Sequence, residues 1–171
     1  MGRRKFISRL LSYVTLLPGV QLLITACGGS SGGGGGSTTA PTTPSDCSSA
    51  GTALTSISTD SNNQIRLCLN TYSNLNSVGG TYRLFVTTQS GATRTISVSV
   101  LNASTVTAVS AVCTHQGCTI GGFSSGAQTY TCPCHSSVFN GDGTVNTGPA
   151  ATSLTTYPTT LSVSEVLVTV T

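Results

Sequence analysis

Hydrophobic and polar residues alternate along several short stretches of the chain from residue 47 onward. In residues 95–100 (TISVSV) the apolar side chains fall on one face and the hydroxyls on the other, a period of two that is typical of a half-buried strand. Gly79-Gly80 and Ser90-Gly91 mark turns. No stretch has convincing helical periodicity, so the pattern predicts an all-β domain, with strands at 64–69, 81–88, 93–101 and 105–112 and a closing hairpin of 159–163 and 166–170.

The first 26 residues have a different pattern, with basic residues followed by an apolar run over 10–24. The run is too short and too interrupted for a transmembrane helix. Residues 3–7 (RRKFI) resemble a twin-arginine export motif. Residues 24–27 (ITAC) resemble a lipobox, in which the chain is cleaved before the cysteine and the cysteine is acylated. We therefore predict that residues 1–26 are a signal peptide and that Cys27 carries lipid. The alternative is an uncleaved N-terminal anchor.

Residues 27–46 consist almost entirely of Gly, Ser, Thr and Pro after Cys27, and they are predicted to be a flexible tether. Residues 47–171 are enough for one domain with its own core. Beyond residue 26 the chain has three arginines against four carboxylates, and none of the clustered basic residues that nucleic-acid binding requires. The composition therefore excludes a nucleic-acid partner.

Cysteine and histidine are concentrated in two segments, 113–118 (CTHQGC) and 132–137 (CPCHSS). Taken as ligands, Cys113, His115, Cys132 and His135 give one thiolate and one imidazole from each of two short loops. Such a set suits a [2Fe-2S] cluster with one iron bound by two Cys and the other by two His. Because two neutral imidazoles replace two thiolates, the reduction potential is expected to be far above that of an all-Cys cluster.

These two segments resemble the cluster-binding loops of Rieske iron–sulfur proteins of the cytochrome bc type. The resemblance implies a Rieske-like antiparallel β-sandwich with a small cluster-binding subdomain at its tip, and a disulfide between Cys118 and Cys134. It also implies that Pro149, within 148–150 (GPA), belongs to a third loop that shields the cluster. In that family the histidine matching His135 is exposed and contacts quinol.

Three positions beside the second loop bear on the potential. Ser137 matches the family serine whose hydroxyl donates to a bridging sulfide. Phe139 stands where high-potential members carry a tyrosine that donates to a cysteine sulfur, and its loss is expected to disfavour the reduced state. Ser136 replaces the usual glycine of the family.

Other interpretations of the cysteines remain open. Two Cys and two His also make a closed, structural zinc site, although zinc leaves Cys118 and Cys134 unexplained. A framework of ordinary disulfides would not explain the placement of the two histidines. Cys47 and Cys68 are expected to pair in an oxidising compartment, the alternative being a second metal site.

The function predicted from these features is one-electron transfer by a membrane-tethered protein that is exported to the periplasmic or extracytoplasmic side. A redox partner is expected. The candidates are a cytochrome b- or c-type protein, with or without quinol, and the large subunit of an exported oxidoreductase, as in arsenite oxidase-like enzymes. A Rieske oxygenase requires a second iron domain, for which the chain has no further histidine. A zinc-stabilised binding module is the remaining alternative.

Overall fold

The structure is a computed structural model that describes residues 47–48 and 51–171. The predicted signal peptide, the predicted lipidation site Cys27 and the predicted tether lie outside these residues. In the described part of the chain, no helix has the length and apolar character needed to cross a membrane. Its helical content there is one short 3-10 turn, η1 (Ser73–Asn76), and the rest of its regular structure is β.

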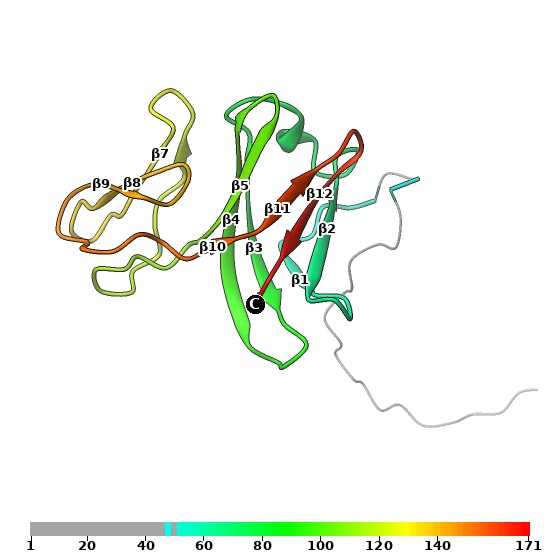
Figure 1. The fold of residues 1–171 in the computed structure, drawn as a ribbon, viewed down its shortest axis with the longest axis horizontal. Coiled ribbons are helices and arrows are strands. Elements are labelled where there is room, and N and C mark those ends of the chain that lie inside the picture. Colours follow the sequence, from blue (N-terminus) through cyan, green and yellow to red (C-terminus); the bar gives the residue numbers. More distant parts are fainter. Residues whose placement is uncertain (1–46, 49–50) are drawn as a thin grey trace, which may run out of the picture. The chain divides into compact units, whose positions relative to one another are not determined.

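Two sheets form a sandwich (Figure 1). The larger has the order β1-β3-β4-β5-β10 and the smaller has the order β11-β12-β2. The pairings are antiparallel, except that β1 runs parallel to β3. The strand bounds are β1 Ser56–Ser58, β2 Gln64–Cys68, β3 Thr81–Thr87, β4 Thr93–Asn102, β5 Thr105–Ser110, β10 Thr156–Tyr157, β11 Thr159–Leu161 and β12 Glu165–Thr169.

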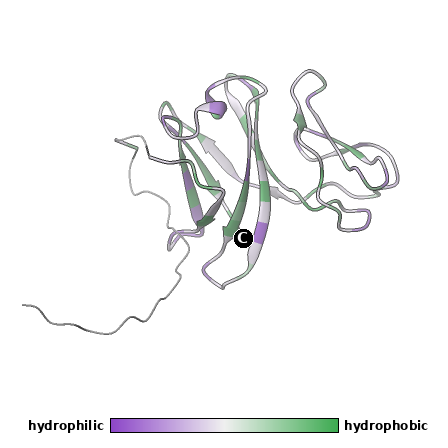
Figure 2. Cartoon of the chain, turned by 180° about the vertical axis from the view of Figure 1, so that it is seen from behind, coloured by the Kyte–Doolittle hydropathy of each residue, from purple (hydrophilic) through white to green (hydrophobic). Residues whose placement is uncertain are grey.

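The sandwich core comes from the apolar face of the alternating stretches. Ile96 and Val98 of β4 are fully buried together with Leu84, Ile65 and Val166 from neighbouring and facing strands. In Figure 2 most of the hydrophobic colour lies on the strands, whereas the turns are pale or hydrophilic. Each fully buried aliphatic side chain stabilises the fold by about 1.5–3 kcal/mol relative to its exposed state, which is enough to fix the register of every long strand.

A second, smaller unit of structure, residues 111–154, is inserted between β5 and β10; we call it the small lobe. Its sheet has the order β6-β7-β8-β9, with bounds Phe123–Ser124, Thr129–Thr131, Val138–Asn140 and Val145–Thr147. The small lobe has a separate hydrophobic cluster that includes Tyr130, Phe139, Cys113 and Cys132. The sequence pattern does not predict these strands, because two or three residues are too few for a period to be recognised.

The hydroxyl face of β4 is buried, although its sequence is typical of a solvated sheet face. Ser97 and Ser99 are 2% and 0% exposed. The Ser99 hydroxyl lies 2.6 Å from the hydroxyl of Tyr130 in the small lobe and donates to Thr81 Oγ1 at 2.9 Å. The polar face of the sandwich is therefore the surface on which the small lobe sits.

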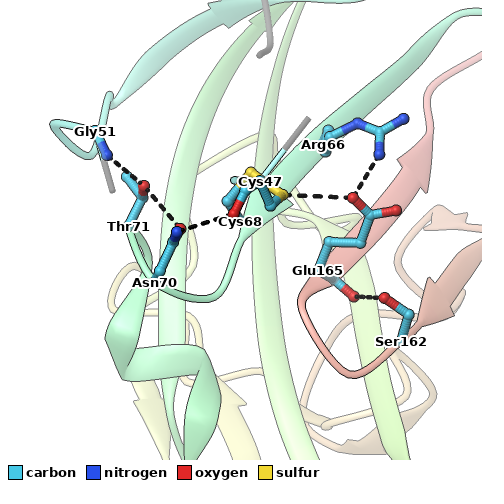
Figure 3. Close-up of a disulfide and its surroundings, with 8 residues drawn as sticks. All are labelled: Cys47, Gly51, Arg66, Cys68, Asn70, Thr71, Ser162 and Glu165. Atoms are coloured by element: carbon cyan, nitrogen blue, oxygen red, sulfur yellow. Dashed lines mark hydrogen bonds and ion pairs between the residues drawn. A yellow bond between two sulfur atoms is a disulfide. The ribbon is translucent and has the colours of Figure 1, made fainter. Parts of the chain in front are cut away.

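Cys47 and Cys68 form a disulfide at the end of the sandwich where the described chain begins (Figure 3). Next to it, Arg66 of β2 forms a diagonal ion pair with Glu165 of β12, the residue that stands opposite Cys68 in the antiparallel register. The Asn70 side chain donates to the Cys47 carbonyl, so a hydrogen bond adds to the covalent link. These contacts hold the first described residues against β2.

Candidate metal centre

The two loops that the sequence singles out adopt the same backbone hydrogen-bond pattern. In the first loop, residues 113–118, Cys113 N–H donates to the Cys118 carbonyl (2.7 Å) and Gly117 N–H donates to the Cys113 carbonyl (2.9 Å). In the second loop, residues 132–137, Cys132 N–H donates to the Ser137 carbonyl (2.7 Å) and Ser136 N–H to the Cys132 carbonyl (3.0 Å). Each loop is thus a tight, independently closed turn that begins at a cysteine.

The fifth residue of each loop has a positive φ, 75° at Gly117 and 60° at Ser136. A side chain in this left-handed region is strained, and glycine is not. The departure from the family glycine at Ser136 therefore falls where the backbone favours glycine most.

Replacing Ser136 by glycine is expected to raise the free energy of unfolding by roughly 0.5–1 kcal/mol, because relief of the left-handed strain exceeds the added entropy of the unfolded chain. Denaturant titration measures the change. Ser153→Gly is the matched control, since Ser153 is exposed and has no positive φ. Equal effects of the two substitutions would contradict the explanation.

A disulfide joins the two loops through Cys118 and Cys134, whose Cα atoms are 6.5 Å apart. The sulfurs of Cys118, Cys132 and Cys134 all lie within 4.8 Å of one another. Because two of these sulfurs are bonded to each other, Cys132 alone among them keeps a thiol to offer a metal. The covalent link therefore lies directly beside a candidate ligand.

Cys113 and Cys132 are free and buried, with exposed fractions of 2% and 1%. Burial raises the pKa of the Cys113 thiol, against hydrogen bonds from the backbone N–H groups of His115 and Gln116. Burial acts in the same direction on Cys132, but hydrogen bonds from the Cys113 thiol and from the backbone N–H groups of Cys134 and His135 outweigh it and lower its pKa. Both loops thus direct their own N–H groups at a sulfur, which favours a thiolate.

The side chains of His115 and His135, one from each loop, contact each other edge to face. Their ring centroids are 4.7 Å apart and the rings are nearly perpendicular, at 88°. His135 is exposed, whereas His115 is half-buried and its Nδ1 is a buried atom with no hydrogen-bond partner. A buried polar atom without a partner is costly, which indicates that a bound group completes the site. Two buried thiols and this nitrogen fit a cluster held by two Cys and two His.

The third loop, residues 148–150, packs on the second. A Cβ added to Gly148 would lie 2.6 Å from Ser137 Cα, so the two backbones are in close contact. Ala150 N–H donates to the hydroxyl of the fully buried Ser137 (3.1 Å), which leaves the O–H free to donate. The exposed Pro149 lies between these two contacts. Thr114 adds a bond from the first loop to the Thr152 carbonyl (2.6 Å).

Phe139 lies on β8, which begins directly after the second loop. It is fully buried, stands opposite Tyr130 in the β7–β8 register and belongs to the same hydrophobic cluster as Cys113 and Cys132. The sequence did not single out Tyr130 or Arg83, which connect the small lobe to the sandwich. Their partners are distant in sequence, so only the fold reveals the contacts.

The fold and the site define a small all-β domain whose two loops present a pair of thiols and a pair of imidazoles. The sequence model of the Rieske [2Fe-2S] domain matches residues 75–158, and this part of the chain is a Rieske [2Fe-2S] domain. Its cofactor is accordingly a [2Fe-2S] cluster.

Curated relatives resemble part of the chain. The cytochrome b6-f complex iron-sulfur subunit of Gloeobacter violaceus is 43% identical over 60 residues, which is 35% of this chain and 32% of that protein. The subunit from a Prochlorococcus marinus strain is 42% identical over 60 residues, 35% of this chain and 33% of that protein. The match thus spans about a third of these relatives.

Solved structures are similar over more of the chain. The plasma membrane Rieske protein PetC3 from Synechocystis PCC 6803 is 30% identical, with a TM-score of 0.47 over 57% of this chain and 93% of that one. The ferredoxin of carbazole 1,9a-dioxygenase from Nocardioides aromaticivorans IC177 is 20% identical, with a TM-score of 0.48 over 61% and 95%.

Proposed function

We propose that the chain is a one-electron transfer protein whose [2Fe-2S] cluster is held by Cys113, Cys132, His115 and His135. The observation that carries the proposal is the buried, unpartnered His115 Nδ1 in the same pair of loops as two buried free thiols. When bound, the cluster accepts and releases one electron. The backbone N–H groups aimed at both sulfurs stabilise negative charge there, and the exposed imidazole of His135 offers a polar contact to a partner.

The partner is proposed to bind through neutral, apolar contacts at the loops. The segments 111–119, 132–137 and 147–152 contain no Asp, Glu, Lys or Arg. Val112, next to Cys113, is 47% exposed, and Pro133 and Pro149 are also exposed. Such a surface suits a quinol or the apolar pocket of a cytochrome b-type partner better than a strongly charged protein, whose approach requires complementary charge. A large subunit of an exported oxidoreductase is the second candidate partner.

Attachment to the extracytoplasmic side of a membrane through lipid on Cys27 is also proposed. The lipobox-like sequence before Cys27 supports it, as do two disulfides, which persist in oxidising compartments. Cys27→Ala in the full chain is the test, and it is expected to change both the processing of the chain and its membrane fractionation. Unchanged processing and fractionation would contradict the proposal.

Reductive titration tests the electron-transfer proposal itself. We expect the oxidised protein to take up one electron per chain, with bleaching of its visible absorption, and to return that electron to an added oxidant. Quinol analogues and a cytochrome c then compare the two kinds of partner. Uptake of no electron, or of two per chain, contradicts the proposal.

Phe139→Tyr is expected to raise the midpoint potential by some tens of millivolts. A phenol that donates to a ligand sulfur stabilises the reduced site, and a hydrogen bond to a charged group contributes roughly 1.5–3 kcal/mol before solvent competition, where about 1.4 kcal/mol corresponds to 59 mV. Ser137→Ala removes a buried donor and is expected to lower the potential by a similar amount. Protein-film voltammetry measures both shifts.

Phe123→Tyr is the matched control for this pair. Phe123 packs on Tyr130 with ring centroids 5.0 Å apart but is only half-buried. Its new hydroxyl can therefore reach water, and the potential is expected to stay unchanged. An unchanged or lowered potential in Phe139→Tyr would mean that residue 139 does not face a ligand sulfur.

A further inference from the structure

One arginine of the sandwich reaches into the small lobe. Arg83 lies on the outward face of β3, and its Nη2 donates to the carbonyls of two consecutive residues, Ile120 (2.8 Å) and Gly121 (2.7 Å). Its Nε donates to the buried Ser97 hydroxyl at 3.3 Å, which fixes the side chain from the sandwich side. The guanidinium is therefore fixed at both ends between the two parts of the domain.

Residues 120 and 121, to which Arg83 donates, are hydrogen-bonded to the backbone just before each of the two loops. Ile120 N–H donates to the Ala111 carbonyl (2.9 Å), two residues before Cys113. Gly121 N–H donates to the Thr131 carbonyl (2.7 Å), directly before Cys132. A Cβ at Gly121 would lie 2.7 Å from that same oxygen, so the two backbones are in close contact. A displacement of residues 120–121 must move the start of both loops.

The positive charge of Arg83 also acts inside the small lobe. Its guanidinium lies against the Ile120 carbonyl, and Ile120 belongs to the same hydrophobic cluster as Cys113 and Cys132. The other arginines that the structure describes bond within the sandwich, Arg66 to Glu165 and Arg94 to the Thr93 carbonyl.

We propose that Arg83 is a positioning residue for the metal centre, which fixes the separation of the two loops through residues 120–121 and favours the reduced, more negative cluster by its charge. This inference rests on the proposed function. It gives the sandwich a direct role in setting the potential. The role depends on two properties of Arg83, its several N–H donors and its positive charge. Substitutions that remove the donors alone, or both the donors and the charge, separate the two contributions.

Arg83→Gln removes the charge and the double contact, and Arg83→Lys keeps the charge. In the Gln variant we expect the equilibrium constant for cluster reduction to fall roughly three- to tenfold, tenfold being about 59 mV for a one-electron couple. The Lys variant should keep a potential close to that of the wild type. Both variants should lose hydrogen-exchange protection at the Gly121 and Ile120 amides, Gln more than Lys.

Arg94→Gln is the matched control, because it removes the same charge from the neighbouring strand without touching the small lobe. A shift of similar size in this control, or a wild-type potential and wild-type amide protection in Arg83→Gln, overturns the inference. If Arg83→Gln retains no cluster, Arg83→Lys provides the test. A wild-type potential with reduced Gly121 amide protection in Arg83→Lys supports the inference, and a lowered potential refutes it. A wild-type protein without a cluster defeats the proposed function instead, while the amide protection still tests the contact.

Discussion

Cys132→Ser is expected to leave a folded chain that retains essentially no iron–sulfur cluster after purification. Cys132 is buried, and hydrogen bonds from the backbone N–H groups of Cys134 and His135 to its sulfur lower its pKa. A serine hydroxyl is a far weaker ligand for iron than a thiolate, because it stays protonated near neutral pH and is a harder donor. Iron and acid-labile sulfide analysis, with circular dichroism to establish that the chain is folded, measures the effect.

The control for this substitution is the double change of Cys47 and Cys68 to serine. It removes the disulfide at the other end of the domain and is expected to cost about 3 kcal/mol of stability through the entropy of the unfolded chain. The iron content should nevertheless stay at the wild-type level. A full complement of iron and sulfide in Cys132→Ser would show that this cysteine is no ligand.

Removal of the other disulfide, by Cys118→Ala with Cys134→Ala, is expected to give a cluster that assembles and is then lost quickly. The bridge closes a loop of 16 residues, and its loss is expected to cost about 3 kcal/mol, which corresponds to an acceleration of cluster loss of up to about a hundredfold. The potential should also fall, because separated loops weaken the N–H hydrogen bonds to Cys113 and Cys132 that stabilise the reduced site. The decay of visible absorption at a fixed temperature measures the rate.

The Cys47/Cys68 double variant again supplies the comparison, since it removes a disulfide of similar span, with a sequence separation of 21, away from the loops. Its cluster should decay much more slowly than that of the Cys118/Cys134 variant. Equal decay in the two variants would mean that the bridge between the loops acts only on overall stability. Free thiols at both positions in the oxidised wild-type protein would mean that the bridge does not exist.

The sandwich could be predicted from the alternation of apolar and polar residues, because its strands are long enough to repeat the pattern. The expected strands 64–69, 81–88 and 93–101 are observed at Gln64–Cys68, Thr81–Thr87 and Thr93–Asn102, and β11 pairs with β12 as the expected hairpin. The parallel strand β1 and the four strands of the small lobe could not be predicted from the sequence. They are two or three residues long, and tertiary contacts define them.

The candidate ligands could be read from the sequence because each pair lies within a few residues of one loop. The bonds that hold the loops in place join distant residues, as between Arg83 and Ile120 or between Ser99 and Tyr130. No local pattern encodes such contacts. The hydroxyls of β4 illustrate the difficulty, since the same alternation describes a solvated face and a face covered by another part of the chain.

Combined metal, sulfide and electron paramagnetic resonance analysis of the purified protein tests the central claim most directly. We expect about two irons and two acid-labile sulfides per chain, as the [2Fe-2S] composition requires, and a red-brown oxidised protein. On reduction we expect a resonance signal typical of mixed His and Cys ligation. One zinc per chain without sulfide, in a colourless protein, would contradict the account.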